Sequence, residues 1–288
     1  MLKTVITQLG LAPRLLVNIG NRNHKKKVIF LLATKFGNSR MIKAEISDVT
    51  NVVQFESLNN IKLNLITPET TLYYAAERDL PTHWDSLPWW GIIWPGGWGL
   101  TKFLQANNLL FENKNILDFA CGCGISSIAA AQLGAKKVVA NDIDLYALYA
   151  TELNAEINHV NTTSTTGSNT AINGDAGNLI HLNGDNLIGD RNLLLFHDCT
   201  KPPDIIICGD IFYDDKMAEA ILLWFKELKI HYKADIDIYF GDPDRWVLQT
   251  METEKKESLF TKVDTILFEE YYSKEHNGIT ESYVYKVN

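Results

Sequence analysis

Acidic residues are missing from the first 44 positions of a chain that is acidic as a whole. The 288 residues include 35 Asp or Glu and 27 Lys or Arg, a formal net charge of −8. Nine of the basic residues precede Glu45, the first acid, so the other 244 residues carry 18 basic and 35 acidic side chains, a net charge of −17. This balance excludes a basic protein that coats nucleic acid by neutralising phosphates. It also indicates that residues 1–44 serve a different purpose from the rest.

Long apolar runs are also absent. No stretch of 18 apolar residues occurs, so the sequence predicts no transmembrane helix and no membrane partner. The acid-free segment is instead basic and amphipathic, because Leu2, Val5, Ile6 and Leu9 fall on one helical face. This composition is typical of a mitochondrial transit peptide, and we expect residues 1–44 to be a leader that directs a soluble protein to the mitochondrial matrix. A solvated, disordered tail is the alternative interpretation.

Cysteine is scarce, and its spacing is uninformative for metal binding. Four cysteines among 288 residues do not form a disulfide framework. Cys121 and Cys123 are separated by one residue rather than the two of a zinc knuckle, and no matching Cys/His pair follows them. We therefore expect small residues that fill a tight turn, and no metal site.

From residue 115 onward, short apolar segments that end in an acid alternate with helical segments. This pattern predicts buried parallel strands in an α/β sheet with helices on both faces. Residues 263–287 predict an antiparallel hairpin at a sheet edge. The expected strands are NILDFA (115–120), VVAND (138–142), LLLFHD (193–198), DIIICGD (204–210) and IDIYFGD (236–242), and the expected helices are 125–134, 144–158 and 215–230.

Two regions differ in composition from this α/β domain, which we expect to span residues 99–288. Five of the seven tryptophans fall between residues 84 and 98, at the end of an N-terminal extension over 45–98 where WPGGW begins a predicted helix. Residues 161–190 contain 21 Asn, Thr, Ser, Gly or Asp among 30. Such a segment has too few apolar anchors to offset its ordering entropy, so we expect a disordered insertion there. A specific binding loop is the alternative.

The first predicted strand leads into a glycine-rich turn. Ligands of parallel sheets bind at the carboxyl ends of the strands, where Asp118-Phe-Ala-Cys-Gly122-Cys-Gly124 precedes a helix. Glycines let the backbone approach a ligand closely. The acid would repel a pyrophosphate but suits a cationic sulfonium amino acid, and the spacing differs from the dinucleotide pattern G-x-G-x-x-G. The turn therefore favours S-adenosylmethionine over NAD.

Acids follow the next two predicted strands as well. Asp142, 24 residues after Asp118, can accept two hydrogen bonds from a ribose diol, and Asp144 fits a helix N-cap. Asp198 is placed to meet the adenine amino group, although a simple turn residue is the alternative for it. The glycine turn and the two acids, in this order, indicate a class I methyltransferase.

The fourth predicted strand ends at a candidate catalytic pair. It continues as Gly209-Asp210-Ile-Phe-Tyr213-Asp214, and the Asn-Pro-Pro-Tyr motif expected for methylation of an adenine amino group is absent. Asp210 and Tyr213 can hold a lysine ammonium, by charge and by the ring face. Because methyl transfer needs the neutral amine and a carboxylate raises a lysine pKa, we expect Asp210 to orient the amine more than deprotonate it.

Four segments carry a resemblance to a known family. WGIIWPGGWGLTKFL, ILDFACGCGISSIAAAQLGAKKVVANDID, DIIICGDIFYDD and FGDPDR, within a similarity from about Ile61 to the C-terminus, resemble the lysine methyltransferases of electron transfer flavoprotein beta subunit. The resemblance implies a Rossmann-like seven-stranded class I sheet, S-adenosylmethionine as cofactor, and that flavoprotein subunit as the partner. It implies cofactor binding by Trp94, Asp118, Gly122, Gly124, Asp142 and Asp198, a lysine site at Asp210 and Tyr213, and a substrate entrance shaped by Asp242 and Arg245.

Departures from the family pattern keep other functions open. Ala120 belongs to the expected cofactor-binding residues and stands where relatives usually have the first glycine of the turn, which brings a methyl group into a close approach to the cofactor. A Trp-rich core competes with a cofactor role for Trp94. The same chemistry on another protein, a non-catalytic assembly factor with this fold, and methylation of a small molecule are the alternatives to the leading hypothesis. The acidic body suits a basic, lysine-bearing partner, although charge alone says little about specificity.

Overall fold

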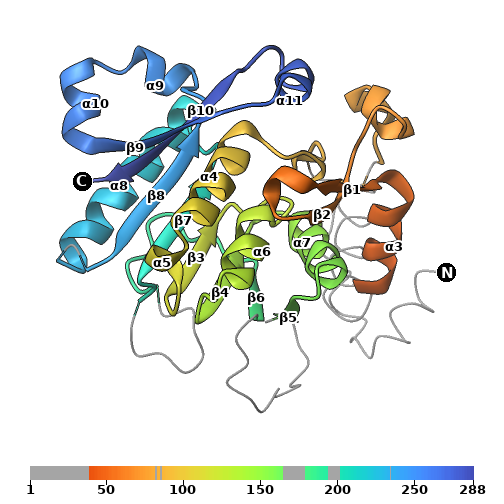
Figure 1. Cartoon of the computed structure of the whole chain (residues 1–288), viewed down its shortest axis with the longest axis horizontal. Coiled ribbons are helices and arrows are strands. Elements are labelled where there is room, and N and C mark those ends of the chain that lie inside the picture. The colour runs from red at the N-terminus through yellow and green to blue at the C-terminus, as the bar shows by residue number, and fades with distance from the viewer. Residues whose placement is uncertain (1–38, 82, 85, 165–178, 194–201, 234) are drawn as a thin grey trace, which may run out of the picture.

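A mixed sheet forms the centre of the part of the chain that the computed structural model describes, namely residues 39–81, 83–84, 86–164, 179–193, 202–233 and 235–288. Helices cover both faces of this sheet (Figure 1). It has eight strands in the order β5-β6-β4-β3-β7-β8-β10-β9, and a separate two-stranded sheet pairs β1 with β2. The class of fold predicted from the sequence is thus confirmed, with one more edge strand than the seven expected.

Six neighbouring strands are parallel, and the last two are antiparallel to them. Their apolar segments bury alternate residues on opposite faces, so Ile116 belongs to one core and Leu117 to the other. The parallel strands are β3 (Asn115–Phe119), β4 (Lys137–Asn141), β5 (Asn161–Ser164), β6 (Leu179–Asn183), β7 (Ile205–Gly209) and β8 (Asp237–Asp242), and the antiparallel strands are β9 (Phe260–Leu267) and β10 (Glu281–Val287).

The strand register brings several carboxyl ends to one edge of the sheet. Phe119 of β3 pairs with Asn141 of β4, which pairs with Asn183 of β6. On the other side, Gly209 of β7 pairs with Gly241 of β8. Strand β4, the next along the chain, lies on one side of β3, and the later strand β7 lies on its other side. The strand order therefore switches at β3. An open parallel sheet binds ligands at such a switch.

Helices pack against both faces of the sheet and form a separate hydrophobic core on each. In Figure 1, α4, α6 and α7 lie beside one another on one face, and α8 covers the other. Asp144 caps α7 by accepting a hydrogen bond from Tyr146 N (2.9 Å), as predicted. The helices are α3 (Ser39–Val49), α4 (Pro95–Ala106), α5 (Asn108–Phe111), α6 (Ile125–Gln132), α7 (Leu145–Ile157), α8 (Asp215–His231), α9 (Trp246–Thr250), α10 (Thr253–Leu259) and α11 (Glu270–Glu275), with 3₁₀ turns at Glu56–Leu58, Thr71–Tyr74, Glu77–Asp79 and Trp89–Gly91. Within the residues described, no helix is both long and apolar enough to cross a membrane.

The C-terminal hairpin is present and also reaches the start of α4. Strand β10 lies between β8 and β9, and α11 forms part of the connection from β9 to β10. The buried Tyr272 of α11 donates a hydrogen bond from its hydroxyl to Ile93 O (2.8 Å) and packs on Trp98, with ring centroids 4.2 Å apart. The hairpin therefore fixes the position of the Trp-rich turn.

The last six residues of the predicted leader, 39–44, belong to a packed helix and not to a disordered segment. Helix α3 begins at Ser39, and its Ile42 and Ile46 are fully buried beside tyrosines of α7. Lys43 Nζ donates to carboxylates of α7, Glu152 at 3.0 Å and Glu156 at 2.6 Å. The lack of acids up to residue 44 therefore does not mark the start of the folded chain, because Lys43 of this acid-free segment pairs with acids of α7. Residues 1–38 lie outside the described residues. Strands β1 (Asn51–Phe55) and β2 (Ile61–Leu65) follow α3 in the N-terminal extension.

The predicted disordered insertion is wrong at both of its ends. Residues 161–164 form the edge strand β5, and residues 179–183 form β6, which pairs with β4. A strand needs backbone partners more than apolar side chains, and the buried Ile180 and Leu182 are enough to anchor β6. The third strand is therefore LIHLN and not LLLFHD, of which residues 194–198 lie outside the described residues, as do 165–178.

Candidate active site

The glycine turn after β3 leaves open space above it. Gly122 (φ +54°) has a backbone that side chains rarely adopt, and a Cβ built on it would meet no atom within 4 Å. Gly124 (φ +77°) is needed for a different reason, because a Cβ there would lie 2.8 Å from Thr151 Cβ. Helix α7 holds the turn: Thr151 Oγ1 donates to Gly122 O (3.2 Å) and Asn154 Nδ2 to Cys123 O (2.8 Å). The turn is therefore held by α7 on one side and open on the other, where a ligand can approach Gly122.

Ala120 occupies a left-handed position in the same turn. Its φ is +56°, which costs a non-glycine residue about 1–2 kcal/mol. Its side chain is half-buried against the core on the α8 face. The departure from the family pattern thus places backbone strain in the folded chain, with or without a ligand.

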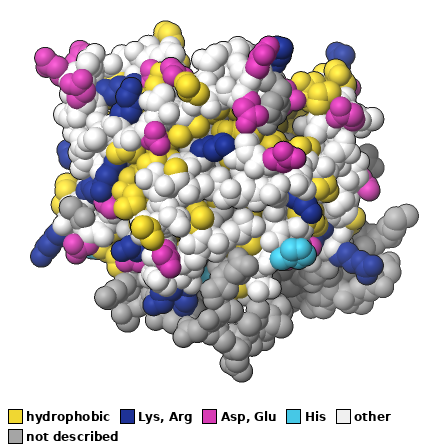
Figure 2. Space-filling view, in the orientation of Figure 1, with side chains coloured by type: hydrophobic (Ala, Val, Ile, Leu, Met, Phe, Trp, Pro, Cys, Tyr) yellow, Lys and Arg dark blue, Asp and Glu magenta, His cyan; other side chains and the backbone are white. Residues whose placement is uncertain are grey.

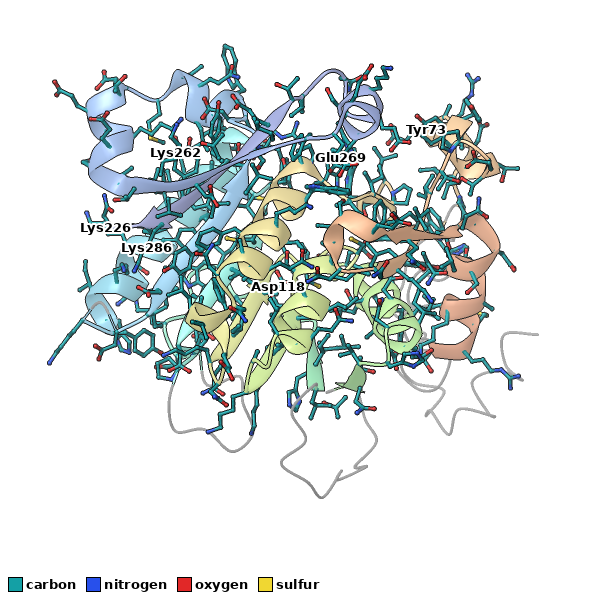
Figure 3. The ribbon with its side chains drawn as sticks, viewed as in Figure 1. Tyr73, Asp118, Lys226, Lys262, Glu269 and Lys286 are labelled. Carbon is teal, nitrogen blue, oxygen red and sulfur yellow. The ribbon has the colours of Figure 1, made fainter. Side chains whose placement is uncertain are left out.

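Asp118 lies beneath the turn rather than on its open side. It is 2% exposed and accepts a hydrogen bond from Ser127 Oγ of α6 at 2.6 Å. Figure 3 shows it at the centre of the molecule next to α6. Burial raises its pKa to about 7. Asp118 therefore ties β3 to the first turn of α6.

Asp142 joins the ends of two neighbouring strands. Its Oδ2 accepts a hydrogen bond from Gly122 N (3.0 Å) and its Oδ1 accepts one from Asp144 N (2.9 Å). Burial raises its pKa to about 6. Ile143, next in the chain, is 74% exposed. Sequence reasoning missed Ile143, which an apolar residue between two acids at a strand end could have signalled.

The third strand contributes residues that sequence reasoning did not find. Asp198 lies outside the described residues, and Asp185 is the acid that follows β6. The buried Asn141 donates from Nδ2 to Asn183 Oδ1 (2.7 Å) and to Asp185 O (2.9 Å). These bonds hold the two strand ends together. The dipeptide Gly-Asp after LIHLN was a signal, but it fell inside the segment taken as disordered.

The N-terminus of α4 lies directly on the ends of β7 and β8. A Cβ on Gly96 would overlap Gly241 O, and a Cβ on Gly209 would lie 2.7 Å from Gly97 Cα. Each of these glycines therefore permits one backbone to touch another. The sequence signal was the glycine pair in WPGGW and the single glycines before Asp210 and Asp242.

Asp210 is buried where these three segments meet. Its side chain is 5% exposed, and its backbone is left-handed, with φ +56°. Gly96 N donates to Oδ2, and Arg245 Nε donates to Oδ1 at 2.6 Å. Burial raises the pKa of Asp210, and the Arg245 guanidinium opposes that shift. Tyr213 points elsewhere: it is 65% exposed, and its hydroxyl donates to Met217 Sδ (3.2 Å).

Arg245 connects Asp210 to the tryptophans. Its Cζ lies 5.7 Å from the centroid of the Trp94 ring, within cation–π range. Trp94 donates from Nε1 to Trp89 O (3.0 Å), and the two rings are 5.6 Å apart. Trp94 is half-buried here, whereas Trp90 and Trp98 are buried in the cores. The Trp-rich segment thus supplies both core residues and the edge of the site.

Asp242 is fully buried and cannot reach a substrate as placed. Its Oδ1 accepts a hydrogen bond from Arg245 N (2.6 Å), so it shapes the entrance only by holding the turn that carries Arg245. Its Oδ2 has no hydrogen-bond partner among the described residues. Burial raises the pKa of Asp242 to about 8, and the nearby Asp210 charge adds to the shift.

The strand order, the glycine turn and the acids after β4 and β6 define a class I methyltransferase. The family described as ribosomal protein L11 methyltransferase (PrmA) matches residues 102–180. A candidate S-adenosylmethionine-dependent methyltransferase from Streptococcus mutans shares the fold, with a TM-score of 0.50, 12% identity, and coverage of 83% of this chain and 56% of its own.

Two curated relatives are similar over most of their length. The electron transfer flavoprotein beta subunit lysine methyltransferase homolog of Caenorhabditis elegans is 34% identical over 244 residues, which cover 82% of this chain and 92% of the relative. The electron transfer flavoprotein beta subunit lysine methyltransferase of Danio rerio is 33% identical, covering 88% and 85%. The chain belongs to the family of electron transfer flavoprotein beta subunit lysine methyltransferases.

Proposed function

We propose that this protein transfers a methyl group from S-adenosylmethionine to lysine side chains of the electron transfer flavoprotein beta subunit. The likeness to the Caenorhabditis elegans relative, over 92% of its length, carries the choice of substrate. The open, acid-bearing sheet edge supports the choice of chemistry. A protein-lysine N-methyltransferase needs a cofactor pocket and an adjoining place for an amine, and the two halves of this edge provide them.

The cofactor is S-adenosylmethionine, and the residues after β3, β4 and β6 fit it. The space above Gly122, where a Cβ would touch nothing within 4 Å, leaves room for the methionine part. Asp142 accepts two backbone N–H groups and keeps lone pairs for the ribose hydroxyls. The exposed Ile143 offers an apolar contact to the adenine ring, and we assign the adenine amino group to Asp185, the described acid at the end of the third strand.

The bound cofactor supplies an electrophilic methyl group on a positively charged sulfur. The chain must hold the lysine Nζ in line with that methyl group and admit the amine in its uncharged form. Trp94 presents ring surface to Arg245, the partner of Asp210, and the exposed Tyr213 follows Asp210 by three residues after β7, where the amine has to enter. The proton that the methylated nitrogen loses goes to solvent at the rim of this site, where Tyr213 and Trp246 are exposed.

The proposed location is the mitochondrion and, within it, the matrix. With α3 assigned to the folded body, residues 1–38 still contain seven Lys or Arg and no acid. This composition suits a mitochondrial import signal. Figure 2 shows acidic and basic side chains interspersed over one face of the molecule, so the net charge of residues 45–288 does not form a uniform acidic field there. We therefore base the choice of partner on the relatives and not on charge.

The test is a methylation assay with the full chain, labelled cofactor and the purified flavoprotein beta subunit. We expect label on that subunit, and in a mitochondrial extract a labelled band at its position. Label only on another band would overturn the choice of substrate. No affinity for S-adenosylmethionine by calorimetry would overturn the enzyme itself and favour an assembly factor.

A further inference from the structure

Both carboxylate oxygens of Asp210 already have partners within the chain. The backbone N–H of Gly96 bonds Oδ2, and Arg245 Nε bonds Oδ1 at 2.6 Å. The side chain is only 5% exposed, and the turn that presents Arg245 is held by Asp242. A lysine ammonium that arrived at Asp210 would therefore have to displace a bound cation. The expectation that Asp210 itself holds the substrate ammonium therefore does not fit this arrangement.

Arg245 keeps part of its positive charge available to the site. Its side chain is 26% exposed and uses Nε for Asp210, and no partner for its two terminal nitrogens is found in the described part of the chain. The guanidinium also lies over the Trp94 ring. The charge beside Asp210 is thus a cation that is fixed in place by an ion pair and an aromatic face.

A fixed ion pair and a bare carboxylate act in opposite ways on an incoming amine. A lone carboxylate stabilises an ammonium and raises its pKa, whereas a neighbouring cation lowers it. Methyl transfer needs the lone pair of the neutral amine, so a bare Asp210 would hold the substrate in its unreactive form. Neutralising that carboxylate removes the obstacle.

We propose that Arg245 neutralises Asp210 and so lets the substrate lysine enter the site as an uncharged amine. This makes Arg245 a positioning residue that acts through Asp210 and through local charge. The inference rests on the proposed lysine methylation and specifies how its site admits the amine.

The other charged or titratable groups around the pair do not cancel this effect. Burial raises the pKa of Asp242 on β8 to about 8, so this carboxyl is mostly protonated near neutral pH, and its ionisation at higher pH is a second titration that the natural chain and the Arg245 variants share. Asp244 is paired with Lys256 of α10. Burial lowers the pKa of His276 after α11 to about 4, with the Arg245 charge adding to the shift, so its ring is neutral. The charges of Asp142 and Asp214 act on Tyr213, whose hydroxyl bonds Met217 and not the ion pair, and both carboxylates accept backbone N–H groups of their own turns.

The test compares the pH dependence of methylation in Arg245→Met and Arg245→Lys with that of the natural chain. Measured from about pH 6.5 to about pH 10, kcat rises as the bound amine loses its proton. We expect the midpoint of this rise to move up by about one pH unit in Arg245→Met, with kcat about tenfold lower near neutral pH and recovery at high pH. Arg245→Lys retains the charge and should retain the midpoint.

A remote ion pair provides the matched control. Arg191 donates to Glu227 through Nε (3.2 Å) and Nη2 (2.9 Å) on the surface, so Arg191→Met should leave the pH profile unchanged. If Arg245→Met does not fold, Arg245→Gln removes the same charge while it keeps a donor toward Asp210. Cofactor affinity is measured by calorimetry in each variant and should stay within about twofold.

Two results would overturn the inference. An equal loss of kcat at every pH in the charge-removing variant, with cofactor affinity kept, would assign Arg245 a purely structural role. A shift of the midpoint in Arg245→Lys as large as in Arg245→Met would show that charge is not responsible. A natural chain that does not methylate lysine at all would instead overturn the proposed function, so the two failures are distinguishable.

Discussion

The two halves of the sheet edge are built in different ways. The cofactor half, formed by the residues that follow β3, β4 and β6, is open: nothing lies within 4 Å of a Cβ at Gly122, and Ile143 is 74% exposed. The lysine half, formed by the start of α4 and the residues that follow β7 and β8, is closed by direct backbone contacts and by the buried Asp210. Openness suits a diffusible cofactor, whereas closure fixes charges around the reacting amine.

The halves also differ in how far apart their parts are in the sequence. Gly122 and Asp142, which hydrogen-bond, are 20 residues apart. Gly96 and Asp210 are 114 residues apart, and Asp210 and Arg245 are 35 apart. A local motif can therefore predict the cofactor half, while the lysine half depends on how α4 packs against two strands.

The largest expected effect comes from adding a methyl group to a glycine of each half: Gly241, which packs against backbone, and Gly122, which faces open space. Gly241→Ala places a methyl group onto Gly96 O, where only backbone could move, and we expect it to lower the free energy of unfolding by about 3 kcal/mol or more. Gly122→Ala meets no atom, so its cost is the left-handed backbone alone, about 1–2 kcal/mol. Denaturant unfolding measures both.

Equal losses in the two glycine variants would contradict the difference in packing. Gly122→Ala should in addition lose affinity for S-adenosylmethionine, because its methyl group enters the space assigned to the cofactor. A Gly122→Ala chain that folds and binds the cofactor as the natural chain does would place the cofactor elsewhere.

How much the sequence predicted follows the same division. The strands that end in acids, the glycine turn, α7 with its cap and the C-terminal hairpin were all recognisable from local pattern. Strand β6 was missed because its anchors lie within a polar segment whose average composition resembles a disordered chain. The pairing of Asp210 with Arg245 was missed because no periodicity records which two distant turns meet. The sequence showed which residues are chemically unusual, and packing decides which of them touch.

The next effect in size separates cofactor binding, which we assign to Asp142, from methyl transfer, which we assign to Asp210. Asp142→Ala should weaken cofactor binding about a hundredfold, since two charge-assisted hydrogen bonds of roughly 1.5–3 kcal/mol each are lost in part. Asp210→Ala should lower turnover more than about tenfold while cofactor affinity stays within about twofold, because Arg245 loses its anchor and an unpaired, no longer fixed cation then faces the arriving amine. Leaving Arg245 and Gly96 N without their partner should also lower stability by about 2 kcal/mol.

Calorimetry and single-turnover methylation measure the two effects separately. The matched control is Glu112→Ala, an exposed acid that follows α5 and precedes β3 at the opposite edge of the sheet, which should change neither quantity. A collapse of cofactor binding in Asp210→Ala would assign this residue to the cofactor half and contradict the division.

A further effect concerns pH and the closed half alone. The pKa of Asp242 is about 8 in the folded chain, far above that of an exposed carboxyl, so the folded state binds a proton that the unfolded state releases. The free energy of unfolding should then fall as pH rises from about 4 to about 8, by up to about 1.4 kcal/mol per pH unit. Denaturant unfolding at several pH values checks this slope.

Asp242→Asn should remove this part of the slope, because an amide does not titrate. The natural chain loses this stability progressively between the unfolded pKa of about 4 and the folded pKa of about 8, so the variant and the natural chain should differ most near pH 8 and least near pH 4. A slope that is unchanged in Asp242→Asn would show that another buried acid, such as Asp118, causes it.

The smallest expected effect tests whether the outer rim of the lysine half meets the substrate protein. Trp246 follows Arg245 and is 69% exposed, so it can contact a docked protein without supporting the fold. We expect Trp246→Ala to raise KM for the flavoprotein subunit about fivefold, the equivalent of about 1 kcal/mol, with kcat and stability unchanged. The control is Leu109→Ala, an equally apolar and 78% exposed residue on α5 that precedes β3 at the opposite edge of the sheet. An equal rise in KM for both variants would mean that exposed apolar surface in general promotes the encounter. A rise for Trp246→Ala alone would extend the lysine half from its buried ion pair to the surface that receives the protein substrate.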